Sequence, residues 1–119
     1  MKRQSQRRQK RRLNLDHAYF FLENEGMKEV ADFIRSTTYP SKGRARSMRR
    51  RLIAGAIREL GLLDKFFEFI HRLDPKLTDI DGDMRKYLDN FDNKAYRDRT
   101  PIYKMQLLEL CKRINGQRK

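Results

Sequence analysis

Two short segments of the chain concentrate side chains that can bind phosphate. Residues 1–12 carry seven bases and residues 42–51 carry six, and neither segment contains Asp or Glu. Ten of these thirteen bases are Arg, whose planar guanidinium binds phosphate oxygens through two parallel hydrogen bonds and stacks on nucleobases. The predicted phosphate-binding residues are Arg3, Arg7, Arg8, Lys10, Arg11, Arg12, Lys42, Arg44, Arg46, Arg49, Arg50 and Arg51.

The rest of the chain carries no net charge. Outside the two segments, 16 Lys and Arg face 16 Asp and Glu, so the whole net charge of +13 lies inside them. Crowding like charges destabilises a fold, and the usual compensation is a polyanion such as nucleic acid, less often an acidic protein or an anionic membrane. For residues 1–12 the alternative is a solubilising or localising tail. We expect no membrane partner, because the basic segments lack interleaved apolar residues that could insert.

A tyrosine precedes the second basic segment. Tyr39 lies in the stretch 37–43, which is predicted to be a loop because it contains Pro40 and Gly43. An aromatic side chain beside arginines can stack on an unpaired base. Tyr39 is therefore a candidate for nucleic-acid binding, and the alternative is a loop residue packed on the domain.

Three alternating aspartates, Asp79, Asp81 and Asp83, resemble the start of a calcium-binding loop. That loop needs glycine at its sixth position and a bidentate Glu at its twelfth, whereas here Gly82 is fourth and Asn90 is twelfth. The match therefore fails. We predict that these aspartates cap the helix that follows, and a looser divalent site of the kind that nucleases use is the alternative.

Other groups with catalytic potential are few. His17 and His71 are the only histidines, and they lack the short spacing that metal ligands share. Cys111, the only cysteine, lies on the apolar side of a predicted helix, as expected of an unreactive core thiol. No nucleophile motif or phosphate-binding glycine loop is present. We therefore predict a protein that is not an enzyme, with no catalytic residues, metal or cofactor.

The elements that would position these residues are helices. Hydrophobic residues make up 38% of the 119 residues, enough for one small helical domain at 13–119 after a disordered arginine-rich tail at 1–12. Apolar residues recur at spacings of three and four, and nothing alternates with the period of two typical of a strand. The sequence predicts an all-α bundle of five or six short helices, at about 15–23, 27–35, 44–60, 64–73, 84–91 and 101–115.

The helix predicted at 44–60 has an apolar stripe only in its later half. Continuing that stripe backward at about 100° per residue places Arg49 on the side of Leu52, Ala56 and Leu60. An unpaired Arg in a core is strongly unfavourable. We therefore predict that the first two turns project past the core and present their bases to solvent, with free backbone N–H groups as a further phosphate site.

Two helices carry more aromatic residues than one small core can bury. Tyr19, Phe20 and Phe21 are consecutive and fan through about 200° of a helix, and Phe66, Phe67 and Phe69 show the same pattern. Either both helices are nearly enveloped, or one aromatic of each set belongs to an exposed patch. Such a patch would bind a protein partner or a second copy of the chain.

These observations favour a non-catalytic nucleic-acid-binding protein. RNA, or a ribonucleoprotein, is favoured over sequence-specific DNA because Arg predominates, Tyr39 can stack, and no helix has the polar outer face that reads bases. In particular, the helix at 64–73 is too apolar for the second helix of a helix-turn-helix motif. The alternative is a regulatory or assembly protein, of phage or mobile-element type, that binds a larger protein through exposed aromatics.

The expected location is intracellular, either cytoplasmic or associated with nucleic acid. The basic N-terminal segment is not followed by the apolar run of a secretory signal, because Asp16 and Glu23 bracket the only candidate stretch. No run of residues approaches the length of a membrane span either.

Overall fold

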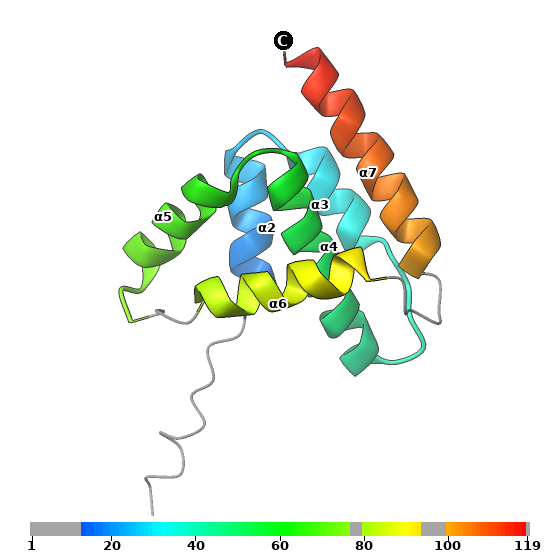
Figure 1. The fold of residues 1–119 in the computed structure, drawn as a ribbon, viewed down its shortest axis with the longest axis horizontal. Helices are drawn as coiled ribbons and strands as arrows, with labels where there is room; N and C mark the ends of the chain where they lie inside the picture. The colour runs from blue at the N-terminus through cyan, green and yellow to red at the C-terminus, as the bar shows by residue number, and fades with distance from the viewer. Residues whose placement is uncertain (1–12, 77–79, 94–99, 119) are drawn as a thin grey trace, which may run out of the picture.

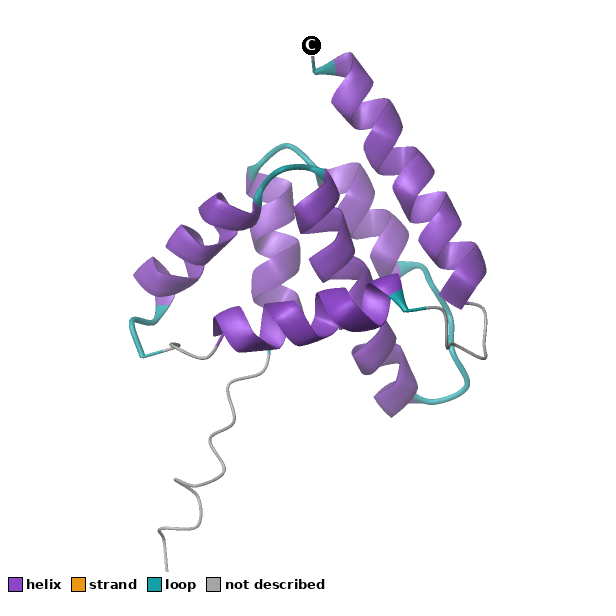
Figure 2. Ribbon diagram, viewed as in Figure 1, coloured by secondary structure: helices purple, strands orange, loops and turns teal. Residues whose placement is uncertain are grey.

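The computed structural model describes residues 13–76, 80–93 and 100–118. This part of the chain forms six helices and no strand, which confirms the all-α prediction (Figures 1 and 2). The helices are α2 (Leu15–Asn24), α3 (Lys28–Arg35), α4 (Lys42–Glu59), α5 (Leu63–Leu73), α6 (Ile80–Asp92) and α7 (Thr100–Gln117). None of the helices described in this way is both long enough and apolar enough to cross a membrane.

Local sequence sets several helix ends as predicted. The side chain of Asn14 caps α2 by accepting hydrogen bonds from the backbone N–H groups of Asp16 (2.9 Å) and His17 (3.3 Å). The chain leaves α2 at Gly26 (φ 80°) and leaves α4 at Gly61 (φ 71°). Both φ angles lie in the left-handed region that glycine adopts without steric cost.

Other helix ends differ from the predicted ones. Helix α4 begins at Lys42, two residues early, because the Ser41 hydroxyl caps it. Helix α6 begins at Ile80, one turn before Met84, and Ile80 is buried. Helix α7 continues through Gly116, where the prediction ended it. One glycine costs a helix only about 1 kcal/mol relative to alanine, so it does not by itself end a helix.

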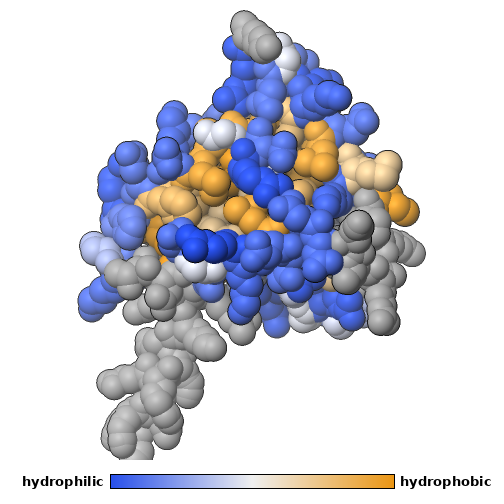
Figure 3. All heavy atoms as spheres, in the orientation of Figure 1, coloured by the Kyte–Doolittle hydropathy of each residue, from blue (hydrophilic) through white to orange (hydrophobic). Residues whose placement is uncertain are grey.

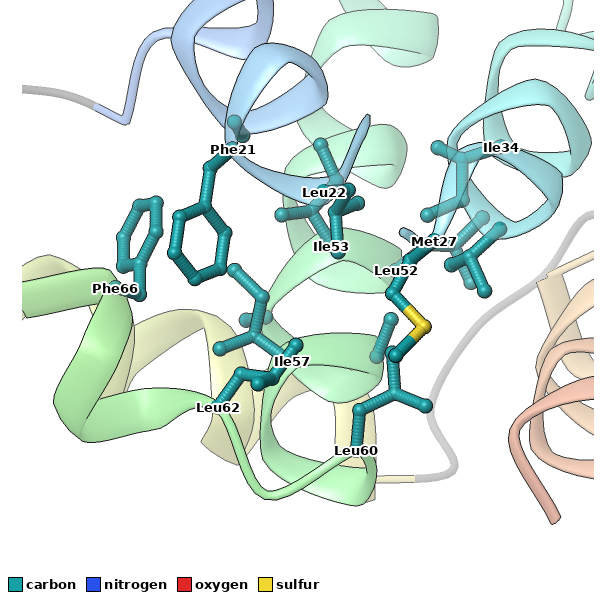
Figure 4. Packing of buried hydrophobic residues seen from close by; sticks show 14 of the residues in the cluster. Phe21, Leu22, Met27, Ile34, Leu52, Ile53, Ile57, Leu60, Leu62 and Phe66 are labelled. Carbon is teal, nitrogen blue, oxygen red and sulfur yellow. The ribbon is translucent and has the colours of Figure 1, made fainter. Parts of the chain in front are cut away.

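Helix α4 is the centre of the domain and contacts every other helix of the described chain. Its residues 52–57 are all buried, which is typical of a helix that is apolar on every side. Figure 4 shows the middle of this core, where Leu52, Ile53 and Ile57 of α4 meet side chains from α2, α3 and the start of α5. The three small residues in the middle of this run, Ala54, Gly55 and Ala56, leave room for neighbouring helices to pack closely against α4.

Helix α5 lies at the edge of this arrangement (Figure 1). Phe66 and Ile70 are buried, whereas Leu73, in the last turn of α5, is 44% exposed although it shares the helical spacing of Phe66 and Ile70. On the face drawn in Figure 3, hydrophobic residues gather between α5, α6 and α7, and hydrophilic residues surround them.

Candidate nucleic-acid interface

The first turns of α4 carry the most exposed bases of the second arginine-rich segment. Lys42, Arg44 and Arg46 are exposed, whereas Met48 is buried. In Figure 1 the start of α4 extends below α6, away from the middle of the domain. The sequence predicted that the first two turns of this helix project past the core. The projecting part is shorter than that, because the core already begins at Met48.

Arg49 turns toward the domain and binds backbone carbonyl groups. Its Nη2 donates to the carbonyl oxygens of Arg35, at 3.2 Å, and of Thr37, and its Nε donates to Thr37 Oγ1 at 3.3 Å. These acceptors lie where α3 ends and the following loop begins. The sequence placed Arg49 on the apolar side of α4 correctly, but the inference that it must therefore face solvent was wrong, since carbonyl groups satisfy the guanidinium.

Arg50 connects α4 to the beginning of the domain. Its Nε donates to the carbonyl oxygen of Leu13 at 2.8 Å, and the side chain is partly buried. Leu13 itself is fully buried. The point at which segment 1–12 joins the domain is therefore fixed against the basic part of α4, although 36 residues separate Leu13 from Arg50 in the sequence.

Arg51 is also partly buried. Its Nη1 lies 3.4 Å from the sulfur of Met48, one turn earlier. Among the five arginines of this segment, only Arg44 and Arg46 are exposed, so the segment divides into solvent-facing and domain-facing bases.

Tyr39 packs on the domain, which is the alternative that the sequence left open. Its ring lies between the Arg49 guanidinium, 5.7 Å from the ring centroid, and the ring of Tyr103, 5.6 Å away in an edge-to-face arrangement. Burial raises the pKa of Tyr39. The hydroxyl of Tyr103 also accepts a hydrogen bond from the backbone N–H of Thr38 at 3.1 Å, so α7 holds this loop in place.

The charge around α4 is unusual for this chain. No Asp or Glu occurs between Asp32 and Glu59, a stretch with eight bases. Arg35 and Arg58, at the two ends of this stretch, pair with Glu23 and Asp92. Outside the stretch, Lys28 pairs with Asp32, Lys65 with Glu25, Arg85 with Asp81 and Arg113 with Glu29. No such ion pair with another described residue involves Lys42 or Arg46.

The predicted residues of the first basic segment, Arg3, Arg7, Arg8, Lys10, Arg11 and Arg12, lie outside the described residues. The structure therefore locates only their attachment point, at Leu13.

The candidates for catalysis or metal binding that the structure describes form no metal site. Asp81 and Asp83 lie in the first turn of α6, where acids favour helix formation, and Asp79 lies outside the described residues. His71 is exposed and His17 is half-buried. In the part of the chain that the structure describes, no group of three His, Cys, Asp or Glu residues could hold a metal ion.

Cys111 lies in the core, as predicted. It is 1% exposed, and burial raises the pKa of its thiol to about 12. A thiol that stays protonated at neutral pH is a poor nucleophile.

Sequence reasoning missed two features of this region. It did not identify the backbone carbonyl groups of Leu13, Arg35 and Thr37 as acceptors for Arg49 and Arg50. Every residue has such a group, so the residue type does not indicate which one accepts a hydrogen bond. It also could not choose which aromatic of each set is exposed. Comparisons with protein-family models, with curated proteins and with solved structures found no match to the chain.

Proposed function

We propose that the chain is a non-catalytic nucleic-acid-binding protein that contacts phosphates through the start of α4 and through segment 1–12. RNA, free or in a ribonucleoprotein, is the favoured target. The observation that carries this proposal is the contrast between two kinds of base. Lys42 and Arg46 are exposed, have no acidic partner among the described residues and lie in a stretch without acids, whereas the exposed bases Lys28, Arg35, Arg85 and Arg113 each pair with a carboxylate.

Lys42 and Arg44 lie at the N-terminal end of α4, where positive charges destabilise a helix. Its first turn contains Lys42 and Arg44 and no acid. The helix macrodipole is positive at this end and disfavours each cation by about 0.3–1 kcal/mol. A bound phosphate would reverse the sign of this interaction and would also accept hydrogen bonds from free N–H groups. The arrangement lowers stability without an anion, which supports a role in anion binding rather than in packing.

The hydrogen bond between Arg50 and Leu13 supports a single binding region. It fixes the end of segment 1–12 beside α4, so the two basic segments can contact one polyanion together. Arg49 and Arg50 help to hold this geometry, because Nε and Nη2 of Arg49 and Nε of Arg50 bind acceptors of the domain.

Two further observations favour RNA over sequence-specific duplex DNA. Arg outnumbers Lys in both segments, and Arg suits both phosphate and splayed bases. Helix α5, which follows α4 after Gly61, buries Phe66 and Ile70 and does not present a basic outer face for the major groove. Tyr39 adds no support, because Arg49 and Tyr103 cover its ring.

The test is the salt dependence of binding to fluorescent single-stranded RNA, duplex RNA and duplex DNA. The full chain is compared with a triple variant, Lys42→Ala, Arg44→Ala and Arg46→Ala. The matched control, Lys76→Ala, Lys86→Ala and Lys112→Ala, removes three exposed bases elsewhere. Each phosphate contact contributes about 0.7–0.9 to the slope of log K against log salt.

We expect a slope of about 6–10 for the full chain, tighter binding to RNA, and a loss of about 2–3 in the slope for the α4 variant. The control should lose less than about 1. A slope near 2 for the full chain, or equal losses in the two triple variants, would contradict the proposal. Tighter binding to duplex DNA would overturn the preference for RNA alone.

A regulatory or assembly protein that binds a larger protein is the second candidate. The exposure of Phe20, at 54%, favours it. In a functional assay, loss of activity on Phe20→Ala, with full activity of the α4 triple variant, would support this candidate. The reverse result would support nucleic-acid binding.

A further inference from the structure

Three bases lie in a row along one side of α4. Lys42, Arg46 and Arg50 are four residues apart within this helix, and residues at that spacing are neighbours on a helix surface, about 5–6 Å from each other. With a rise of about 1.5 Å per residue, the row is about 12 Å long. These three residues are called the basic row below.

No carboxylate compensates the basic row. Residues 33–58 contain no Asp or Glu, and none of the three bases forms an ion pair with a residue that the structure describes. Lys42 and Arg46 are exposed. Arg50 is partly buried, but only its Nε donates to another described residue, at Leu13. Like charges four residues apart destabilise a helix, so folding alone does not account for the row.

The opposite side of the projecting part of α4 carries a single base. Arg44 is two residues away from both Lys42 and Arg46, and two residues turn a helix by about 200°. One turn after Arg44 the same side reaches Met48, which is buried. A row of bases therefore follows one flank of α4 and not the other.

The basic row ends where the first basic segment joins the domain. Nε of Arg50 donates to the carbonyl oxygen of Leu13 at 2.8 Å. Figure 1 shows the start of α4 below the start of α2, so the row runs from the projecting end of α4 toward the attachment point of segment 1–12. That segment adds seven bases and no acid. A polyanion bound along the row therefore reaches segment 1–12 at its attached end.

We propose that the basic row binds the backbone of a single-stranded RNA segment, which follows this side of α4 and continues onto segment 1–12. The inference rests on the proposed function and names the class of RNA. A helix in the groove of a duplex has a backbone on each side, and bases would then be expected on both flanks. One row with one continuation matches one backbone. In addition, the major groove of an RNA duplex is too narrow for side chains to read.

Arg50 joins the two contacts in this arrangement. Its Nε holds the attachment point of segment 1–12, while Nη1 and Nη2 form no hydrogen bond with another described residue. A guanidinium has five N–H donors in one plane, so one Arg can bind a carbonyl oxygen with Nε and a phosphate with its Nη groups. Lysine offers no such division, because its donors share a single nitrogen.

The test compares binding of the full chain to a fluorescent oligouridylate, about 20 nucleotides long, with binding to a perfect RNA duplex of the same length. Each contact to a single strand contributes about 0.7 to the slope of log K against log salt. Lys42→Ala and Arg46→Ala should therefore each lower the slope for the oligouridylate by about 0.7. The matched control, Arg44→Ala, removes an exposed Arg from the opposite flank and should lower it by less than about 0.3.

Two further results are expected. The oligouridylate should bind at least about tenfold more tightly than the duplex at equal salt. Arg50→Ala should lower the slope by more than about 0.7, because the variant loses its own phosphate contact and also releases the attachment point of segment 1–12. Circular dichroism confirms that each variant folds.

The outcomes separate this inference from the proposed function. Equal losses for Arg44→Ala and Arg46→Ala, or a duplex bound as tightly as the oligouridylate, would overturn the single-strand arrangement and leave nucleic-acid binding in place. Tighter binding of polyglutamate of the same length would identify an acidic protein segment as the occupant and would also overturn it. A slope of about 2 with every nucleic acid would overturn both the inference and the proposed function.

Discussion

The ring of Phe91 in α6 lies directly on Gly55 in α4. A Cβ atom added to Gly55 would come within 2.6 Å of this ring, well inside the distance of van der Waals contact. Phe91 is 1% exposed, and the amine of Lys104 lies 4.9 Å from its centroid. The absence of a side chain at Gly55 therefore sets how closely α4 and α6 approach each other.

Gly55→Ala should destabilise the fold although alanine favours helix formation. The propensity gain of about 1 kcal/mol is smaller than the cost of overpacking beside a buried ring, so we expect a net loss of about 1–3 kcal/mol. Urea unfolding followed by circular dichroism measures this change. Gly43→Ala is the control, because an added Cβ there has nothing within 4 Å. Gly43→Ala should be neutral or stabilising. Equal effects of the two substitutions would show that the Phe91 ring shifts to make room for the added Cβ atom.

Replacement of Arg49 should lower stability, unlike replacement of exposed Arg46. Arg49→Ala leaves the carbonyl groups of Arg35 and Thr37 without their donor, which costs about 1–3 kcal/mol. Arg49→Lys should recover little, since an ammonium cannot reach the same acceptors in one plane. Arg46→Ala should stay within about 0.5 kcal/mol of the original chain in the same urea experiment. If Arg49→Ala is equally harmless, these hydrogen bonds do not stabilise the fold.

Lys42→Glu should raise stability and weaken nucleic-acid binding at the same time. The substitution replaces a cation by an anion at the positive end of α4, for a gain of about 0.3–1 kcal/mol or more. It should also lower the slope of the salt dependence by about 1. Lys112→Glu is the control, because Lys112 is equally a surface lysine but lies before the last turn of α7, which contains no base. It should change stability little and leave binding nearly unchanged; thermal unfolding and RNA titration measure both effects.

The thiol of Cys111 should make the fold less stable at alkaline pH. Burial raises its pKa from 9.0 to about 12, so between these values the unfolded chain has released a proton that the folded chain retains. Stability is therefore complete below pH 9 and falls as pH rises, by up to about 1.4 kcal/mol per pH unit. Urea unfolding between about pH 8 and 11 should show a steeper loss for the original chain than for Cys111→Ala.

This comparison also removes the effect of the tyrosines. Burial raises the pKa of Tyr19 and of Tyr39, and both remain in the Cys111→Ala variant. Identical pH profiles for the two chains would mean that the thiol ionises in the folded state.

Helical periodicity was enough to predict the all-α fold class. The apolar face of a helix and its caps depend on residues that are close together in the sequence. The side chain of Asn14 and the backbone of Gly26 act on atoms within a few residues, and both ends of α2 follow from them. The end of α7 did not follow, since Gly116 lowers helix propensity without forbidding the helix.

The candidate site was less predictable, because its geometry depends on contacts between distant residues. The pattern showed that Arg49 shares a face with Leu52, but the acceptors at Arg35 and Thr37 are backbone groups that any residue type provides. The exposure of Phe20 rather than Tyr19 depends on how α2 packs on the other helices. Both questions concern tertiary packing, which residue spacing along one helix does not determine.

The hydrogen bond between Arg50 and Leu13 fixes the point beside α4 at which segment 1–12 joins the domain. Twelve residues reach at most about 40 Å when fully extended, so a strand bound at the start of α4 would remain within their range. If segment 1–12 binds the same strand as α4, a connection this short gives the second contact an effective concentration in the millimolar range. Loss of the Arg50 contact would then lower avidity for long strands much more than affinity for a strand too short to reach both segments.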